Sequence, residues 1–173
     1  MLPDATLPDP GLKIARKPLA AMGVLGFASG LPILLTFFTL QQWMSESGIS
    51  LKAIGLTASI GLPYLLKFLW APLLDRLPPG FLRRLGRRRG WLLPIQAALC
   101  LSIVAMAASD PHDQPRRLVL AAVTLAFFSA SQDVVIDAWR IESFVPRLQA
   151  AALGFYVWGY RIAMQVSLSL IHI

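Results

Sequence analysis

The chain has 173 residues, of which 56% are hydrophobic and only 14% are charged. Soluble domains usually carry about 25% charged residues, so this composition argues against a soluble globular protein. The net charge is +7, and the charged residues cluster in short segments. The long uncharged stretches between these segments can span a lipid bilayer. The single cysteine, Cys100, excludes an internal disulfide.

The first membrane span is predicted near residues 19–43. Residues 1–17 mix prolines, acids and three basic residues, and they predict a short irregular cytoplasmic tail. No charge follows from Pro18 to Ser45, which is too long for the core of a signal peptide, about 7–15 residues. Gly26 and Gly30 form a GxxxG pattern that permits close helix approach, and we expect Pro32 to kink the helix.

Four further apolar stretches follow, separated by short polar segments. Each has roughly the 20 residues that a helix needs to cross about 30 Å of hydrocarbon. The predicted spans lie near residues 53–74, 90–109, 118–139 and 148–167. The sequence therefore predicts an all-α polytopic membrane bundle of about five transmembrane helices.

The basic residues predict which side of the membrane each loop occupies. The tail and the loops at 75–89 and 140–147 hold eleven of the sixteen Lys and Arg residues, whereas the turns at 46–52 and 110–117 hold three. Basic loops stay on the cytoplasmic side, so we expect a cytoplasmic amino terminus. A nucleic-acid-binding patch at 75–89 is the alternative, and the apolar stretches on both sides argue against it.

The last six residues, LSLIHI (168–173), match one reading frame of a transposase-type sequencing adaptor. We interpret them as a read-end scar and exclude His172 from functional reasoning. The alternative is an authentic helix end.

Several motifs resemble a known transporter family. Asp75-Arg76 followed by Gly86-Arg87-Arg88, between two spans, resembles the loop signature of the major facilitator superfamily, GxxxD[RK]xG[RK][RK]. The match is partial, because Ala71 occupies the first glycine position and residues 78–85 are inserted. Further strings narrow the resemblance to the AmpG-type muropeptide permeases and the related acetyl-coenzyme A transporter branch: GFASGLP (26–32), GLPYLLKFLWAPLLDR (61–76), GRRRGWLL (86–93), SASQDVVIDAWRIE (129–142) and GYRIAM (159–164).

This resemblance, which covers residues 20–167, implies a function and a site. It implies that the complete protein imports sugar–peptide fragments of peptidoglycan, which contain an anhydro sugar, across the bacterial inner membrane. It also implies that the proton gradient drives this import. Such transporters have two helical halves with the substrate between them near the midplane. The chain would supply part of the amino-terminal half, would need the remaining helices as partners and would not transport by itself. We expect a gating role, by charge pairing, for Asp75, Arg76, Gly86, Arg87 and Arg88.

Two aspartates in the fourth span are candidates for proton coupling. Asp133, Asp137 and Arg140 are spaced by four and three residues and share one helix stripe. Asp133 would lie about 10 Å deep, counted from Arg140, and ionisable groups at depth usually serve transport. Asp133 is the better candidate, since Asp137 could instead pair with Arg76, Arg140 or the arginine loop.

The fifth span carries the predicted substrate-binding face. Gly154, Trp158, Arg161 and Gln165 share one helix face and offer a guanidinium, an aromatic plane and an amide to a sugar–peptide. The alternative for Arg161 is a structural ion pair with Asp133. Lys67 is either a cation in the cavity or a membrane anchor, and Tyr160 is either a ligand contact or a packing residue.

Two other function classes are weaker. An intramembrane transferase needs clustered aspartates that hold Mg²⁺, and Asp133 and Asp137 are not joined by a second aspartate-rich motif. A non-transporting membrane scaffold is disfavoured because an arginine within a span, such as Arg161, is energetically costly and usually serves transport. We expect no metal, no cofactor and no nucleic-acid partner; a different transported cargo, such as an acyl-coenzyme A, a sugar or a drug, stays open.

Overall fold

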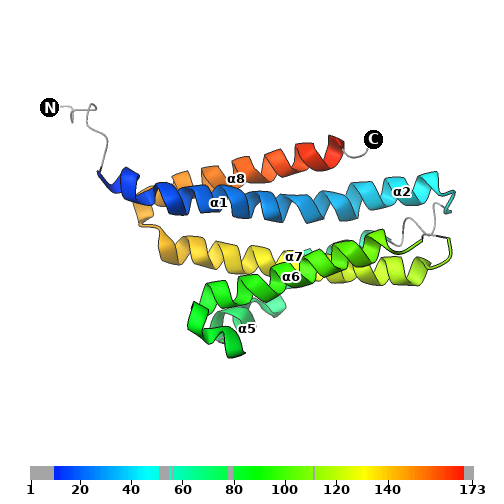
Figure 1. Ribbon diagram of the computed structural model, residues 1–173, viewed down its shortest axis with the longest axis horizontal. Coiled ribbons are helices and arrows are strands. Elements are labelled where there is room, and N and C mark those ends of the chain that lie inside the picture. Colours follow the sequence, from blue (N-terminus) through cyan, green and yellow to red (C-terminus); the bar gives the residue numbers. More distant parts are fainter. Residues whose placement is uncertain (1–9, 51–54, 56, 78–79, 111, 170–173) are drawn as a thin grey trace.

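Every regular element in the described part of the chain is a helix. The computed structural model describes residues 10–50, 55, 57–77, 80–110 and 112–169. The long helices lie lengthwise along the molecule (Figure 1); they are α1 (Pro10–Leu34), α6 (Arg87–Ala107), α7 (Pro115–Ser143) and α8 (Pro146–Ser169). The all-α class predicted from the sequence is confirmed for these residues.

Among the residues that the structure describes, three helical stretches are long and apolar enough to cross a membrane: Arg16–Glu46, Arg87–Ala107 and Pro115–Ser143. The helix α8 has 24 residues, but the polar side chains of Gln149, Arg161 and Gln165 lower its mean hydropathy. A shorter apolar helical stretch covers Ser59–Leu69. The count of five spans, with the boundaries given above, therefore stays a prediction.

The first span is one long rod with an irregular middle. The helix α1 continues through a π-helical turn, η1 (Leu35–Thr39), into α2 (Leu40–Glu46), as Figure 1 shows. The Thr36 hydroxyl donates to the carbonyls of Pro32, at 2.9 Å, and Ile33, at 3.0 Å. Pro32, which has no N–H to donate, lies inside α1 just before this π turn; the kink expected there stays a prediction.

The tail differs from its prediction in the part that the structure describes. Residues 10–17 are helical and belong to α1, which begins at Pro10. Proline is well suited to a first helical position because its fixed φ already fits the helix. The prediction of an irregular tail over residues 1–17 is therefore wrong for residues 10–17; residues 1–9 lie outside the description.

The second predicted span is not one continuous helix over the residues described. It is a series of short pieces: η2 (Thr57–Gly61), α4 (Leu62–Leu66), η3 (Lys67–Leu69) and α5 (Ala71–Arg76), followed by η4 (Gly80–Leu85). Pro63 and Pro72 each lie in the first turn of a new piece. Since proline removes a helical hydrogen bond and clashes with the preceding turn, the helix restarts at each one.

The helices α1 and α8 approach each other closely through glycine. A Cβ on Gly30 would lie 2.6 Å from the Tyr160 carbonyl oxygen, and one on Gly26 would overlap the Tyr156 carbonyl. Gly159 on α8 faces the Gly23 carbonyl in the same way. The close approach predicted from the GxxxG pattern is therefore present, and its partner is α8.

The helix α7 is the centre of the packing. It contacts α1, α6, the short pieces between 57 and 76, and α8. Leu118, Leu125 and Val135 on α7 are fully buried among side chains of α2, α5 and α6, and Ile136 joins Met22 in a second core towards α1 and α8. Because it is enclosed from several sides, α7 can present polar side chains to the interior.

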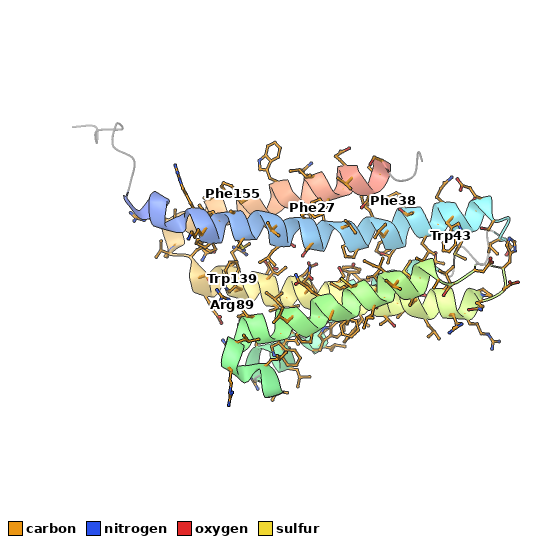
Figure 2. The ribbon with its side chains drawn as sticks, in the orientation of Figure 1. Phe27, Phe38, Trp43, Arg89, Trp139 and Phe155 are labelled. Atoms are coloured by element: carbon orange, nitrogen blue, oxygen red, sulfur yellow. The ribbon has the colours of Figure 1, made fainter. Side chains whose placement is uncertain are left out.

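Two tryptophans mark opposite ends of the bundle. Figure 2 shows Trp139, on α7, at the same end as Arg89, and Trp43, on α2, at the far end. Tryptophan favours the two membrane–water interfaces, where its ring is apolar and its N–H reaches water. The bundle therefore has the length and the terminal aromatics of a membrane-spanning unit.

Candidate functional site

A cluster of polar side chains lies inside the bundle around Asp133. Tyr156, on α8, donates its hydroxyl to Asp133 Oδ1 at 3.3 Å. One residue earlier on α7, Gln132 donates from Nε2 to the Ser29 hydroxyl of α1 at 3.1 Å. Lys67 and Tyr64 lie near enough to Asp133 to interact with it electrostatically. We call Ser29, Tyr64, Lys67, Ser129, Gln132, Asp133, Tyr156 and Tyr160 the interior polar cluster.

This interior polar cluster has more hydrogen-bonding capacity than its own members use. Ser129 and Gln132 are both 0% exposed. Gln132 Oε1 has no hydrogen-bond partner among the described residues, whereas the Tyr64 and Ser129 hydroxyls lie close enough to interact with each other. A buried polar group without a partner costs about 1–3 kcal/mol, so a water molecule or a ligand group beside Gln132 Oε1 would be stabilising.

Asp137 lies in a different environment from Asp133, one turn closer to the end of α7. Its side chain is exposed and its Oδ1 pairs with Arg140 Nη2 at 3.4 Å. Arg140 also donates to Gln149 Oε1 at 3.1 Å, and Gln149 donates to the Phe144 carbonyl at 2.7 Å. Asp137 therefore belongs to the contacts that fix the connection between α7 and α8. Arg140 is one of the partners that the sequence analysis named for it.

A second group of charges joins the ends of three helices. Arg88, at the start of α6, contacts Asp75 Oδ1 of α5 and Glu142 Oε1 of α7, each at 2.6 Å, and it is only 9% exposed. Its Nε also donates to Glu142 Oε2 at 3.1 Å, which makes the pair two-pronged. Arg87 adds a contact to Glu142 at 2.7 Å and a bond to the Asp75 carbonyl at 2.9 Å. We call Asp75, Arg87, Arg88 and Glu142 the rim ion cluster.

The predicted gating residues fall into two groups in the structure. Asp75, Arg87 and Arg88 are brought together, whereas Arg76 is exposed and forms no ion pair with the residues described. Gly86 precedes α6 with φ 87° and ψ 157°, a backbone conformation that is essentially restricted to glycine. It thereby orients Arg87 and Arg88 at the start of the helix.

Sequence reasoning missed Glu142, the carboxylate that both arginines share. The available signal is its position: it follows the apolar part of α7 at the end that the arginine loop also occupies. Trp70 was missed too. Its indole N–H donates to the Ser131 hydroxyl at 3.0 Å, and its ring lies 4.8 Å from that of Phe127, so it fixes the 57–76 segment against α7.

The predicted substrate-binding residues of α8 are divided between two of its faces, and Lys67 lies on η3. Trp158 is 72% exposed, and Arg161 and Gln165 are also exposed, on the side of α8 opposite Gly159 and Ala163. Tyr160 instead lies on the inner side, with its ring 6.3 Å from that of Tyr156. The structure thus groups Tyr160 and Lys67 with Asp133, and it leaves Trp158, Arg161 and Gln165 together on an outer face.

Arg161 and Asp133 do not form the ion pair that the sequence left open. No salt bridge joins them among the described residues, and Asp133 interacts instead with Tyr156 and Ser29. Arg161 is exposed on α8, whereas Asp133 is half-buried on α7. They are therefore available for separate roles.

Comparisons with known proteins match this chain to transporters. The family model described as acetyl-coenzyme A transporter 1 matches residues 20–114. The anhydromuropeptide permeases of Escherichia coli strains K12 and O157:H7 are each 46% identical over 157 residues, which is 90% of this chain and 31% of theirs. An uncharacterized protein of Haemophilus influenzae is 41% identical over 151 residues, 87% of this chain and 35% of its own. The chain therefore spans about a third of the length of these relatives.

Proposed function

The chain belongs to the anhydromuropeptide permease (AmpG) family of the major facilitator superfamily, and we propose that the complete protein imports peptidoglycan-derived anhydro-muropeptides across the bacterial inner membrane by proton symport. Membership of this family makes it a transporter and not an enzyme. Membrane lipid, the sugar–peptide substrate, protons and the remaining helices of the transporter are the partners in this proposal.

The observation that carries the proposal is the enclosed carboxyl group of Asp133. It lies within a helix apolar enough to span a membrane, among polar side chains from α1, α4 and α8. Ionisable groups inside spans are costly and usually mark substrate or proton pathways. In the proposed cycle, Asp133 takes up and releases the coupling proton, and Lys67 responds to the change in its charge.

The substrate is assigned to the outer face of α8. Arg161 can hold a peptide carboxylate with two parallel hydrogen bonds at any working pH, Trp158 can stack on a sugar ring, and Gln165 can bond hydroxyls. In transporters built from two halves the substrate lies between them. The exposure of this face supports a location at the boundary with the rest of the protein, while Tyr160 and Lys67 contribute from the interior polar cluster.

The rim ion cluster is proposed as a gate latch at the cytoplasmic end. Its ion pairs join α5, α6 and α7, so their separation would let these helix ends move apart. Arg76 and Gly86 belong to the same loop. This role requires the loops at 75–89 and 140–147 to be cytoplasmic and the turns at 46–52 and 110–117 to be outside, as the distribution of basic residues predicts.

Cysteine labelling tests that topology. In a Cys100→Ala background of the complete protein, cysteines at Ser47 and Gln114 should react with an impermeant maleimide in intact spheroplasts. A cysteine at Gly80 should react only after the membrane is opened. The reverse pattern would contradict the assigned sidedness and the location of the gate.

An acyl-coenzyme A is the second candidate cargo, because the matching family model is described as an acetyl-coenzyme A transporter. Liposomes that hold the complete protein can separate the two. Labelled anhydro-muropeptide should accumulate when the outside is made acidic, and excess unlabelled muropeptide should block this uptake. Uptake of labelled acetyl-coenzyme A without uptake of muropeptide would contradict the proposed cargo, and uptake that ignores the proton gradient would contradict symport.

A further inference from the structure

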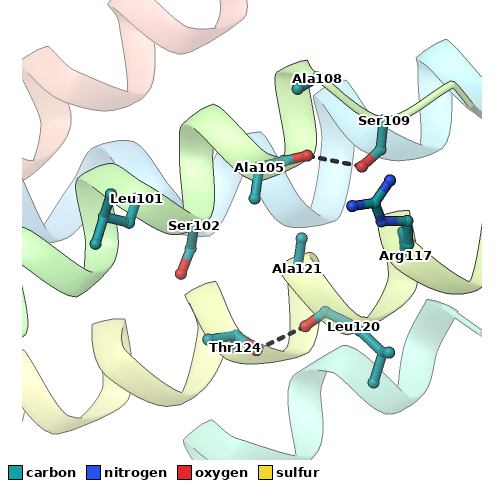
Figure 3. Close-up of a pocket in the computed structure, with 9 residues that line it drawn as sticks. All are labelled: Leu101, Ser102, Ala105, Ala108, Ser109, Arg117, Leu120, Ala121 and Thr124. Atoms are coloured by element: carbon teal, nitrogen blue, oxygen red, sulfur yellow. Dashed lines mark hydrogen bonds between the residues drawn. The ribbon is translucent and has the colours of Figure 1, made fainter.

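A groove with a volume of about 450 Å³ runs between the second half of α6 and the first half of α7. Figure 3 shows its side chains, with Ala105 and Ala121 facing each other across the groove. Both helices are apolar enough to span a membrane, and the groove lies near the turn that joins them. It is therefore placed near one membrane–water interface, whichever side of the membrane that is.

The walls of the groove suit a hydrocarbon chain. Ala105 and Ala121 leave the space that larger residues would fill, and the rims are Leu101 and Leu120, which are 70% and 67% exposed. The hydroxyls that line the groove are used within their own helices. Ser109 donates to the Ala105 carbonyl at 2.7 Å and Thr124 donates to the Leu120 carbonyl at 2.7 Å (Figure 3). An apolar ligand would thus leave no hydroxyl of these two residues without a partner.

Arg117 gives one end of the groove a positive charge. It lies in the first turn of α7, and Figure 3 places its guanidinium beside Ser109 at the end of the groove. Arg117 donates to Gln114 Oε1 at 2.7 Å, which uses one of the five N–H groups of a guanidinium. Asp110, one of the two acids in the turn, accepts from the backbone N–H of His112 at 2.8 Å. Among the described residues neither Asp110 nor Asp113 forms an ion pair with Arg117.

We propose that this groove binds an anionic phospholipid, with one acyl chain between α6 and α7 and the headgroup phosphate on Arg117. Guanidinium groups pair with phosphate oxygens in two-pronged fashion, and basic pockets between spans select anionic lipids. A helix from the rest of the protein is the other possible occupant. An apolar helix would set Arg117 against hydrocarbon with no counter-charge, whereas a phosphate supplies one.

Lipid binding to the complete protein tests the proposal. The protein is purified, stripped of lipid and titrated with phosphatidylglycerol or phosphatidylcholine, with native mass spectrometry as the readout. Arg117→Gln should weaken phosphatidylglycerol binding about fivefold, which corresponds to roughly 1 kcal/mol for one cation on an anionic lipid, and should leave phosphatidylcholine unchanged. Ala121→Phe, which fills the groove, should weaken both lipids.

Two control variants test whether the loss of lipid binding is specific to the groove. Arg116→Gln removes the neighbouring charge outside the groove, and Ala97→Phe adds the same ring to an exposed position of α6; neither should alter binding. Unchanged phosphatidylglycerol binding in Arg117→Gln, or an equal loss in Arg116→Gln, would overturn the headgroup assignment. Unchanged binding in Ala121→Phe would overturn the acyl-chain assignment.

The unaltered protein gives a second measurement that does not depend on the folding of variants. A photoactivatable phosphatidylglycerol should cross-link to peptides within residues 101–124, and cross-links only elsewhere would overturn the proposal. In the lipid-stripped Cys100→Ala protein, a cysteine at Ala105 should react with a membrane-permeant maleimide. Protection of this cysteine would show that a helix of the same chain occupies the groove, and the lipid assignment would be withdrawn.

Discussion

The rim ion cluster and the interior polar cluster hold their charges in opposite ways. At the rim, Asp75, Arg88 and Glu142 satisfy one another at 2.6 Å while the two carboxylates stay about half exposed. In the interior, Asp133 accepts a long hydrogen bond of 3.3 Å from Tyr156 and interacts with Ser29 and Lys67 without a salt bridge, and Gln132 Oε1 has no partner among the residues described. Complete pairing favours one arrangement of the helices, whereas incomplete pairing leaves a group ready to exchange partners. We therefore propose that the rim ion cluster stabilises one arrangement of the helices and that the interior polar cluster takes up and releases protons.

The largest expected effect comes from the interior polar cluster. Asp133→Asn keeps the size of the side chain and removes its ability to ionise, so proton-driven accumulation by the complete transporter should fall to the level of empty liposomes. Exchange of labelled for unlabelled substrate, which needs no net proton movement, should continue. Asp137→Asn is the matched control, because Asp137 is exposed and paired with Arg140. Equal loss of accumulation in both variants would contradict a special role for Asp133.

The next largest effect should be at the rim. Arg88→Gln leaves Asp75 and Glu142 without their shared cation and should lower the free energy of unfolding by about 2 kcal/mol, measured by thermal unfolding of the complete protein in detergent. Arg84→Gln removes an exposed arginine of the same loop and should change stability by less than about 0.5 kcal/mol.

Gating by the rim can be separated from its contribution to stability. Asp75→Asn should slow transport while substrate affinity stays within a few-fold, since the latch does not touch the substrate. If affinity collapsed while conformational cycling continued, the rim would be part of the substrate site and the contrast between the two clusters would fail.

Substitution of Arg161 tests whether the carboxylate of the substrate binds outside both clusters. Arg161→Lys keeps the charge but loses the two-pronged geometry, so binding of the sugar–peptide should weaken about tenfold, or ~1.4 kcal/mol. Equilibrium binding to the complete protein is the measurement, and Arg147→Lys is the control at the start of the same helix. The double variant Arg161→Asp with Asp133→Arg exchanges the two charges. If each single variant were inactive and this double variant transported substrate, the two residues would be a structural pair and the substrate assignment would be withdrawn.

The smallest effect should come from the backbone that supports the rim. Gly86 has φ 87° and nothing within 4 Å of an added Cβ, so Gly86→Ala should cost about 1 kcal/mol from backbone strain alone. Gly154→Ala, also with nothing within 4 Å but inside a helix, should be neutral or slightly stabilising. Equal changes in both melting temperatures would exclude a conformational requirement at Gly86.

The sequence by itself determined the class of the protein and the position of its charges along the chain. Helical apolar stretches and a basic loop follow from composition and charge spacing, because burying uncharged residues in a bilayer and keeping arginine in water are local preferences. The spacing of Gly154, Trp158, Arg161 and Gln165 was enough to place them on one face, since helix periodicity alone fixes that relation.

Only the tertiary structure decided which charges meet. Glu142 is separated by more than fifty residues from Arg88, and Ser29 by more than one hundred from Gln132; no local pattern connects such pairs. Tyr160 was left open between a ligand contact and a packing residue; packing of Gly159 against Gly23 places it on the inner side near Tyr156 and leaves Arg161 exposed. The packing of α8 on α1 sets that rotation, because two helices with glycine at their contact can approach closely on one face only.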